Sequence, residues 1–522
     1  MGLNLASLID NSCRLFPDAV ALIHDERRLT YRELRRNVGA VAAHLAKLGV
    51  RPGDRVALFL PNRMSFTVAY FGILQAGGVV VPISYLSVGR EVSYALRDSG
   101  ASLLIAWSAF EVAAREGVRG AVAQGPAAAA EGPATGPGIL LEDESRGPLT
   151  VVDGPPIDSG AWQEEFQSNP DDTAVILYTS GTTGEPKGAE LTHFNLFSNA
   201  QYCSERLLWR PGRAEFLGPG QVGLAALPLF HSFGQTCIQN ACLLGGAAVS
   251  YLERFEPQAA LRVMTRDRVT MFAGVPTMYV QLLRSSGADG HDLSALRFCN
   301  SGGAAMPVEV MREFDARFGV NVLEGYGLSE TSPVATFNVL WRPKKVGSIG
   351  LPILGVDVRV FDPDDRELPT GEVGELVIRG YNVCKGYWRR PEATREAMRR
   401  GWFHTGDLGR KDEDGYLFIV DRKKDMIIRG GYNVYPREIE DVLRQHPGVR
   451  DVAVAGLASA EWGETVGAWV VISEDNLDES ELLSFAADRL AAFKCPRVIV
   501  FVDELPRNAL GKVLKQQLPA PA

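Results

Sequence analysis

A loop rich in glycine and hydroxyl residues follows a short apolar run in the first half of the chain. Ala174-Val175-Ile176-Leu177 predicts a buried strand. The residues that follow are Tyr178-Thr179-Ser180-Gly181-Thr182-Thr183-Gly184-Glu185-Pro186-Lys187-Gly188. Glycines let backbone N–H groups approach a polyanion, Ser and Thr add donors, and lysine adds a compact positive charge. The loop therefore favours a triphosphate site. It does not fit the Walker A pattern, and a plain surface turn is the competing interpretation.

Length and charge limit the class of protein. A chain of 522 residues is too long for one hydrophobic core and predicts at least two domains. A net charge of −9 without a dominant basic stretch argues against a nucleic-acid partner. The 7 cysteines are scattered without CxxC or metal-ligand spacing, which indicates packing residues in a reducing compartment.

The N-terminal residues and the apolar runs predict a cytoplasmic protein. Met1 to Asp10 include no basic segment, and Ala6 breaks the myristoylation pattern. Apolar runs such as 237–252 include Gln239 and Asn240 and are shorter than a membrane span, so we expect no transmembrane segment. Peripheral membrane contact and a homodimer are left open.

Alternating helix and strand patterns predict an α/β fold. Thr30 is a candidate N-cap for a helix through Leu48, and strand–helix–strand order on this spacing indicates doubly wound parallel sheets before and after the loop. Residues 345–420 alternate with turn signals, which indicates an antiparallel, barrel-like sheet. Residues 113–170 are rich in Ala, Gly and Pro and predict a loose surface excursion.

A charged segment divides two sheet-forming regions. Asp421-Arg422-Lys423-Lys424-Asp425 is a candidate hinge, and a compact α+β pattern follows it. We therefore predict a large N-terminal domain (1–421) of two doubly wound α/β subdomains plus the barrel-like region, a hinge (422–425) and a small α+β C-terminal domain (426–522).

Several further motifs follow the loop in a fixed order. They are Leu227-Pro228-Leu229-Phe230-His231, Tyr326-Gly327-Leu328-Ser329-Glu330-Thr331, His404-Thr405-Gly406-Asp407, Asp421-Arg422, Gly430-Gly431-Tyr432-Asn433 and Pro506-Arg507-Asn508-Ala509-Leu510-Gly511-Lys512. Together with the loop they resemble the adenylate-forming superfamily of acyl-CoA synthetases, luciferases and peptide-synthetase adenylation domains. The resemblance covers nearly the whole chain and is strongest to bacterial fatty-acid–CoA ligases.

The resemblance implies an ATP·Mg²⁺ site. The residues it assigns to the nucleotide are Thr179, Ser180, Gly181, Thr182, Thr183, Gly184, Lys187, Gly303, Gly325, Tyr326, Gly327, Asp407 and Arg422. Glu330, with Thr183, would bind Mg²⁺, a hard cation that prefers oxygen ligands. Asp407 would accept both ribose hydroxyls, and Thr331 would reach the α-phosphate. The structural alternatives are a core tyrosine at 326, a turn aspartate at 407 and a capping glutamate at 330.

The resemblance also implies catalytic and coenzyme residues. Lys512 would bridge the substrate carboxylate and the α-phosphate, because one cation between two anions lowers their repulsion. His231 would lie beside the carboxylate; a buried neutral histidine bonded to backbone is the alternative. Lys424 would be the hinge of a mobile C-terminal domain, and Gly430 and Gly431 would let the pantetheine arm of coenzyme A pass. Ser232 lacks the Gly-x-Ser-x-Gly pattern of a serine hydrolase.

The acyl pocket implied by the resemblance is apolar. Its predicted residues are His231, Phe233, Gly234, Cys237, Gly274, Met278, Gly302, Gly303, Ala304, Gly325, Gly327 and Val334. None of these carries a fixed charge, which favours an apolar acid, and the glycines suggest depth. A medium- or long-chain fatty acid is the first choice and a cinnamate-type acid the second.

The expected reaction activates a carboxylic acid with ATP and transfers the acyl group to coenzyme A. An aryl-CoA ligase and an acyl-AMP ligase that loads a carrier protein are the alternatives within this chemistry. A non-catalytic acyl-nucleotide sensor is the alternative from another class, and the presence of Lys187, Glu330, Asp407 and Lys512 argues against it.

Overall fold

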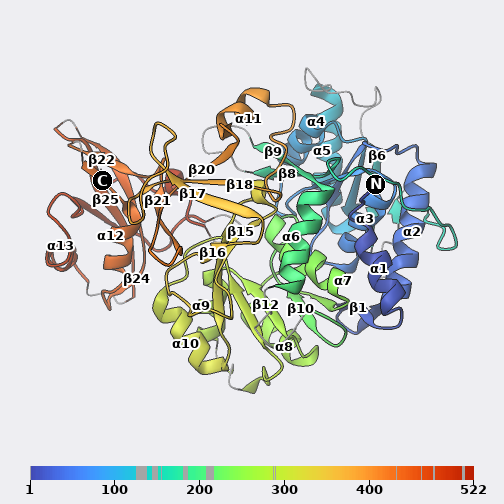
Figure 1. Ribbon diagram of the computed structural model, residues 1–522, viewed down its shortest axis with the longest axis horizontal. Helices are drawn as coiled ribbons and strands as arrows, with labels where there is room; N and C mark the ends of the chain where they lie inside the picture. The colour runs from blue at the N-terminus through green and yellow to red at the C-terminus, as the bar shows by residue number, and fades with distance from the viewer. Residues whose placement is uncertain are drawn as a thin grey trace. The chain divides into compact units, whose positions relative to one another are not determined.

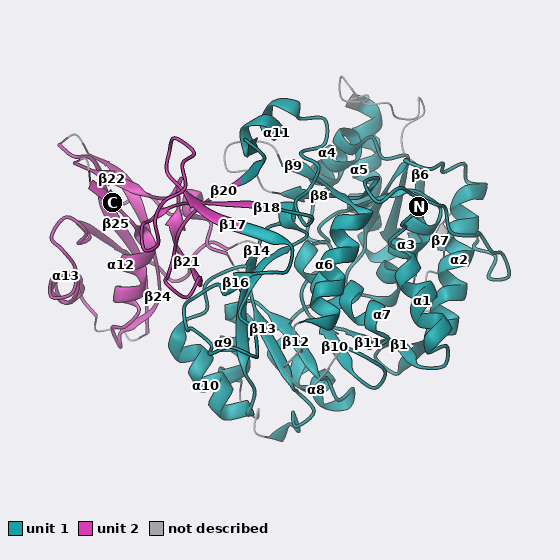
Figure 2. Cartoon of the chain, in the orientation of Figure 1, with its two compact units in different colours: residues 1–357, 379–403 teal, residues 358–378, 404–522 magenta. Residues whose placement is uncertain are grey.

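The computed structural model forms two compact units (Figure 2). The first comprises residues 1–357 and 379–403, and the second comprises 358–378 and 404–522. The structure describes residues 2–124, 138–143, 151–153, 156–179, 186–206, 217–285, 287, 290–430, 432–459, 461–473, 477–507 and 512–521. The second unit begins at residue 358 and therefore includes part of the predicted N-terminal domain. The predicted hinge at 422–425 stays a prediction.

A seven-stranded sheet in the first unit has the order β7-β6-β5-β3-β4-β8-β9 (Figure 1). Its strands are β3 (Arg55–Phe59), β4 (Val79–Pro82), β5 (Leu103–Trp107), β6 (Gly138–Glu142), β7 (Val151–Asp153), β8 (Thr173–Thr179) and β9 (Lys187–Thr192). The central pairs are parallel, with Val56 opposite both Val80 and Leu103. Their apolar side chains are buried, as expected for parallel strands covered on both faces. The predicted doubly wound sheet is confirmed, and antiparallel pairs occur at its edges.

A nine-stranded sheet in the same unit has the order β16-β15-β14-β13-β12-β10-β11-β1-β2. Its strands are β1 (Val20–His24), β2 (Arg27–Thr30), β10 (Val222–Ala225), β11 (Ala248–Tyr251), β12 (Met271–Gly274), β13 (Phe298–Ser301), β14 (Val322–Gly327), β15 (Val334–Phe337) and β16 (Leu351–Pro352). The strands from β1 to β14 through β10 pair in parallel. β10 lies between β11 and β12, so the next two strands of the chain are placed on opposite sides of β10. Ligand sites in such sheets lie at the carboxyl ends of strands near this reversal.

Helix α3 (Met64–Gln75) lies between the two sheets. All of its residues are buried, and it contacts β3 and β4 of one sheet and β1 of the other. A helix that is apolar all round needs such a position, because it has no face for solvent.

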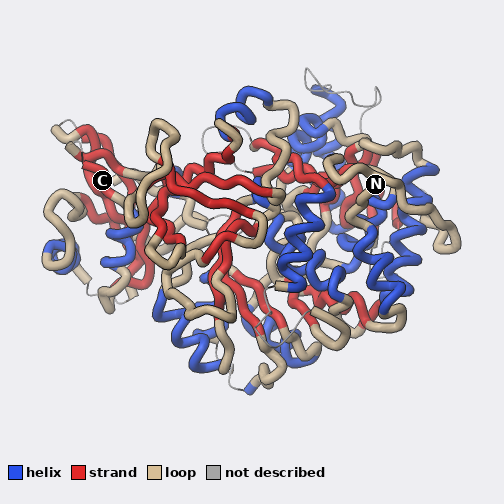
Figure 3. The backbone as a smooth tube through the Cα atoms, in the orientation of Figure 1, coloured by secondary structure: helices blue, strands red, loops and turns tan. Residues whose placement is uncertain are grey.

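The other helices of the first unit cover the sheets (Figure 3). They are α1 (Ser7–Leu15), α2 (Tyr31–Lys47), α4 (Gly89–Ser99), η1 (Ser108–Phe110), α5 (Glu111–Gln124), α6 (His193–Glu205), η3 (Phe233–Asn240), α7 (Ala241–Gly245), α8 (Pro257–Arg266), α9 (Pro276–Arg284), α10 (Val308–Phe318), η5 (Ser329–Thr331) and α11 (Pro391–Ala397). Thr30 caps α2 as predicted, and Glu33 completes a capping box. Here α8, α9 and α10 pack side by side (Figure 1).

The predicted loose excursion over 113–170 is wrong in part. Helix α5 packs closely on α4, and β6 extends the seven-stranded sheet beside β5. A β-carbon at Gly117 would lie 2.4 Å from Val92 Cγ1, so glycine permits the close approach of α5 to α4. Residues 125–137, 144–150 and 154–155 lie outside the described part of the chain.

A five-stranded sheet follows, with the order β17-β18-β20-β19 and β21 paired to β20. Its strands are β17 (Val356–Phe361), β18 (Gly374–Gly380), β19 (Met398–Arg399), β20 (Trp402–Lys411) and β21 (Leu417–Arg422). β20 pairs antiparallel with both β19 and β21, which agrees with the antiparallel region predicted for 345–420.

The C-terminal residues of the second unit form an α+β module. Its sheet has the order β23-β22-β25-β24, with β26 paired to β25. Its elements are β22 (Ile427–Arg429), β23 (Tyr432–Val434), α12 (Pro436–Leu443), β24 (Val449–Ser459), β25 (Gly463–Ile472), α13 (Glu479–Ala487), β26 (Val498–Phe501) and η6 (Lys515–Gln517). Apolar residues of α12, including Ile439 and Leu443, are fully buried in its core. Among the described residues, no helix is long and apolar enough to cross a membrane.

Candidate active site

The base of the predicted phosphate loop is an antiparallel hairpin of β8 and β9. Thr179 and Lys187 lie opposite each other, one register step beyond Tyr178 and Gly188. This pairing places the first and last residues of the predicted phosphate loop next to each other at one end of the hairpin. Ser180, Gly181, Thr182, Thr183 and Gly184, the rest of the predicted phosphate set, lie outside the described residues.

The structure brings Lys187 and Glu330 together through Tyr387. The Lys187 Nζ atom is 5.4 Å from the centre of the Tyr387 ring, and the Tyr387 hydroxyl donates a 2.9 Å hydrogen bond to Glu330 Oε1. Glu330 is 8% exposed and belongs to the short helix η5. Burial, with Glu330 as a second cause, raises the pKa of Tyr387 far above its usual range, so the hydroxyl stays a donor. The candidate phosphate-binding lysine and the candidate metal-binding carboxylate thus contact the same tyrosine.

Tyr387 is held in place by backbone contacts with β9. Trp388 N donates to Gly188 O at 2.7 Å, and Glu190 N donates to Gly386 O at 2.9 Å. Beyond it, Arg390 forms a 2.6 Å ion pair with Asp98, whose other oxygen accepts the Tyr178 hydroxyl at 2.8 Å. The sequence analysis missed Tyr387, Asp98 and Arg390. The only local signal is Gly386-Tyr387 ahead of a helix that starts at Pro391, and nothing in that spacing points to Glu330.

The Thr331 hydroxyl forms hydrogen bonds within the turn that contains this residue. Its hydroxyl accepts a hydrogen bond from Leu328 N at 2.9 Å and bonds the Pro333 carbonyl. The residue is fully buried, so contact with an α-phosphate stays a prediction. Tyr326 is half-buried on β14, between Gly325 and Gly327.

His231 has a buried imidazole nitrogen available for a ligand. Its Nε2 atom is shielded from solvent and has no hydrogen-bond partner among the described residues. Burial lowers the pKa of His231 to about 4, so the ring is neutral at pH 7. An unpaired buried polar atom costs stability, which fits a group that faces a polar ligand better than a histidine satisfied by backbone.

The predicted pocket glycines differ in what they face. A β-carbon at Gly302 would lie 3.1 Å from the Phe233 ring, and one at Gly303 would lie 3.4 Å from Val275. By contrast, a β-carbon at Gly234 would lie 2.6 Å from Pro228 O, and one at Gly327 would lie 1.7 Å from Pro333 O. The inference of depth from these glycines is therefore wrong for Gly234 and Gly327, where close backbone packing requires glycine. Gly274 and Gly325 likewise face the rings of Phe272 and Phe337.

The remaining pocket candidates lie on three elements and in the segment after β13. Phe233 and Cys237 are on η3, a π-helix, which is a rare form often found at functional sites. Cys237 Sγ is 3.8 Å from Cys203 Sγ, and this contact, with burial as a second cause, raises the pKa of the Cys237 thiol. Met278 is buried on α9, Val334 is buried on β15, and Ala304 is exposed after β13.

The second unit brings Asp407, Arg422 and Lys512 together. Asp407 on β20 lies opposite Arg422 on β21, and their side chains form a 3.0 Å ion pair. Burial, with the charge of Arg422 as a second cause, lowers the pKa of Lys512 to about 8, and the charge of Asp407 opposes this shift. The two residues predicted for the ribose and the predicted catalytic lysine therefore form one cluster, although Lys512 is far from them in sequence.

The candidate hinge residue Lys424 and the candidate coenzyme residues Gly430 and Gly431 follow Arg422 closely in the sequence. Lys424 is exposed in a turn in which Asp425 N donates to Arg422 O at 3.0 Å. Gly430 has φ +56°, and a β-carbon there would lie 2.8 Å from the Trp462 ring. Glycine is thus required by the turn itself, and passage of pantetheine stays a prediction. Gly431 lies outside the described residues.

Family models match both regions of the chain. The AMP-binding enzyme model matches residues 9–388, and the AMP-binding enzyme C-terminal domain model matches residues 438–512. The chain belongs to the AMP-binding enzyme family. The recognition made from the order of the motifs is confirmed, and this AMP-binding enzyme stands among the AMP-forming acid–CoA ligases.

Similar proteins cover this AMP-binding enzyme almost completely. A long-chain-fatty-acid–CoA ligase of Bacillus subtilis (strain 168) is 37% identical, covering 98% of this chain and 94% of the relative. A feruloyl-CoA synthase of an Amycolatopsis species is 40% identical, covering 97% and 96%. The crystal structure of ATP-bound MatB from Rhodopseudomonas palustris has a TM-score of 0.85 at 34% identity, covering 99% and 98%.

The residues at Glu330 fit a hard divalent cation. Its carboxylate is nearly buried, and the hydrogen bond from Tyr387 to Oε1 fixes its orientation. Groups of three or more His, Cys, Asp or Glu side chains suited to a metal do not occur within the described ranges. A single carboxylate is enough when phosphate oxygens and water supply the remaining ligands of Mg²⁺.

Proposed function

We propose that this protein activates a medium- or long-chain fatty acid with ATP and transfers the acyl group to coenzyme A. In the first step, a carboxylate oxygen attacks the α-phosphorus of ATP, giving the acyl-adenylate and pyrophosphate. In the second, the coenzyme A thiol attacks the acyl carbon, giving the thioester, AMP and a proton. The observation that carries the proposal is the cluster of Lys512, Asp407 and Arg422.

The residues have distinct roles in this reaction. Asp407, held by Arg422, accepts the ribose hydroxyls, and Lys512 supplies the cation between the two anions. Lys187 binds the terminal phosphates over the ring of Tyr387, and Glu330 would hold Mg²⁺. When bound, Mg²⁺ neutralises phosphate charge. Neutral His231 offers Nε2 to the carboxylate without adding a charge.

Burial of a charged lysine lowers the stability of the folded protein, so a buried lysine needs a functional reason. At pH 7, most of the Lys512 population is still protonated with a pKa of about 8. Burial disfavours the charged form of this lysine, and the neighbouring carboxylates of Asp407 and Asp425 offset that cost only in part. A site that receives two anions during each turnover explains this arrangement.

A second acid class has support of its own. Gln235, on η3 between Phe233 and Cys237, is fully buried, and both of its carboxamide atoms lack partners among the described residues. A hydroxylated aromatic acid could bond such a group, whereas a saturated acyl chain could not. The feruloyl-CoA synthase relative agrees with this alternative. A dicarboxylic acid has less support, because the predicted pocket residues carry no fixed cation.

The test is pyrophosphate release over a panel of fatty, cinnamic and dicarboxylic acids, with and without coenzyme A. We expect the highest kcat/KM for a fatty acid and thioester formation only with coenzyme A. Release with ferulate alone, abolished by Gln235→Leu, would establish the aryl alternative. Acyl-adenylate that accumulates with coenzyme A present but is consumed by a carrier protein would establish the loading alternative.

Lys512→Ala tests the site itself. We expect adenylation to fall by roughly 10²-fold or more, as when a preorganised charge is removed from a reacting centre. Thioester formation from supplied acyl-adenylate should persist. Normal pyrophosphate exchange in this variant would overturn the role of Lys512, and ATP binding without any turnover in the wild type would favour the sensor.

A further inference from the structure

The segment that carries Lys512 is closed at its base by backbone contacts. Arg507 and Val513 form an antiparallel bridge, and Leu514 N donates to Pro506 O at 2.8 Å. Residues 508–511 lie outside the described part, and Lys512 follows them directly. The position of Lys512 therefore depends on how this base, residues 506–507 and 512–515, is attached to the module.

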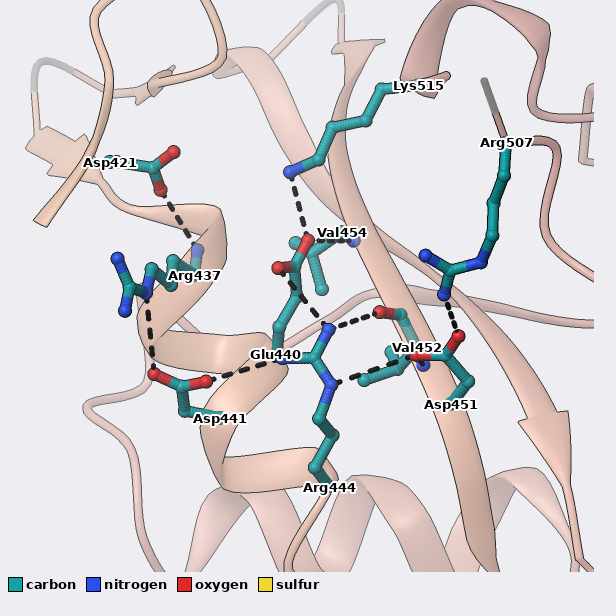
Figure 4. Close-up of polar contacts among 10 residues, drawn as sticks. All are labelled: Asp421, Arg437, Glu440, Asp441, Arg444, Asp451, Val452, Val454, Arg507 and Lys515. Carbon is teal, nitrogen blue, oxygen red and sulfur yellow. Dashed lines mark hydrogen bonds and ion pairs between the residues drawn. The ribbon is translucent and has the colours of Figure 1, made fainter. Parts of the chain in front are cut away.

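Two cations attach the base, one on each side of Lys512 in the sequence (Figure 4). Arg507 Nη2 bonds Asp451 Oδ2, and Lys515 Nζ lies 2.9 Å from Glu440 Oε1. The acceptors come from different elements, because Asp451 is on β24 and Glu440 is on α12. The side chains of Lys515 and Glu440 are only 21% and 12% exposed, so solvent and salt screen this pair weakly.

The acceptor carboxylates are themselves fixed. Glu440 Oε1 accepts Val454 N at 2.9 Å, and Asp451 Oδ1 accepts Val452 N at 2.8 Å. Arg444 lies between them, with nitrogens 3.8 Å from Glu440 Oε2 and 3.7 Å from Asp451 Oδ1 (Figure 4). A base anchored to such carboxylates has less freedom than one attached to mobile surface groups.

We propose that Lys515 and Arg507 are positioning residues for Lys512 in the adenylation step. The inference rests on the proposed role of Lys512. Both act through the attachment of this base, because Lys515 pairs with Glu440 and Arg507 pairs with Asp451. Catalysis by a charge between two anions depends on its place to within about 1 Å, so a loosely attached base lowers the rate even when Lys512 is intact.

The test separates the two half-reactions. In Lys515→Met we expect kcat for adenylation to fall roughly tenfold to a hundredfold, with the KM for ATP nearly unchanged. Thioester formation from supplied acyl-adenylate should match the wild type, which also shows that the module is folded. Lys515→Arg should restore most of the lost rate because it keeps the cation. Arg507→Met should behave like Lys515→Met.

Lys494→Met is the matched control. Lys494 pairs with Glu438, which lies on α12 as Glu440 does, and its Nζ atom is 2.7 Å from both carboxylate oxygens. The Lys494 side chain is 23% exposed. We expect its adenylation rate to be near that of the wild type. An equal fall in Lys494→Met, or equal losses in both half-reactions of Lys515→Met, would overturn the inference, and so would normal adenylation in both Lys515→Met and Arg507→Met.

Lys512→Ala distinguishes this inference from the proposed function. If Lys512→Ala abolishes adenylation while Lys515→Met and Arg507→Met leave it intact, only the positioning role fails. If Lys512→Ala leaves adenylation intact, the proposed function of Lys512 fails first.

Discussion

The Tyr387 hydroxyl donates a 2.9 Å hydrogen bond to Glu330 Oε1. Its ring lies against Lys187 at the same time, so a single side chain contacts both the candidate metal-binding acid and the candidate phosphate-binding lysine. The bond orients the carboxylate of Glu330.

Tyr387→Phe removes the hydroxyl and keeps the ring. A hydrogen bond to a charged group is worth about 1.5–3 kcal/mol, so we expect the Mg²⁺ concentration for half-maximal adenylation to rise roughly tenfold or more. The KM for the carboxylic acid should change little. Calorimetry of ATP binding, with and without Mg²⁺, gives a readout independent of turnover. An unchanged Mg²⁺ dependence in both assays would mean that Tyr387 only packs.

The pH profile of adenylation should report Lys512. Lysine loses its cation as pH rises through its pKa, and burial with Arg422 lowers that pKa to about 8. Because Lys512 is then protonated, we expect its contribution to kcat/KM for adenylation to be at its maximum below pH 7. We expect kcat/KM to fall as the pH rises above about 8. In Lys512→Arg this limb should disappear from any residual activity, because arginine stays charged. A limb that persists in Lys512→Arg belongs to another group.

Gly302 is a direct test of the acyl pocket. Its β-carbon would lie 3.1 Å from the Phe233 ring, and its backbone does not require a positive φ, unlike Gly303 with φ +79°. We expect Gly302→Val to displace that ring and shift kcat/KM toward shorter acids by roughly tenfold or more, with little change in the KM for ATP. Gly302→Val combined with Phe233→Leu should recover longer acids. An unchanged profile for both variants would exclude these residues from the pocket.

Lys424→Pro tests the hinge. Proline fixes φ near −65° and restricts Lys423, whose N–H donates to Gly406 O at 2.9 Å. We expect adenylation to persist and transfer to coenzyme A to fall roughly tenfold or more, because one orientation of the small domain cannot serve both steps. Lys424→Ala is the control for loss of the side chain. Parallel losses in both half-reactions would indicate an unfolded turn, and no loss in either would place the hinge elsewhere.

Local sequence was sufficient where neighbouring residues alone decide the outcome. Thr30 and Glu33 cap α2 because their partners are three residues apart. Apolar runs became the strands of parallel sheets, and the order of the motifs led to the family. The prediction from composition is wrong at 113–124, since this Ala- and Gly-rich segment belongs to a helix in which small residues let α5 approach α4.

The sequence by itself thus determined the central parallel strands, the cap at Thr30 and the family. Only the tertiary structure decided which distant groups meet. Tyr387 reaches Glu330, and Arg507 and Lys515 reach carboxylates on separate elements. The lowered pKa of Lys512 also depends on burial, which no local pattern encodes. The physical reason is that capping and strand formation act over a few residues, whereas burial and charge pairing depend on packing between segments far apart in the chain.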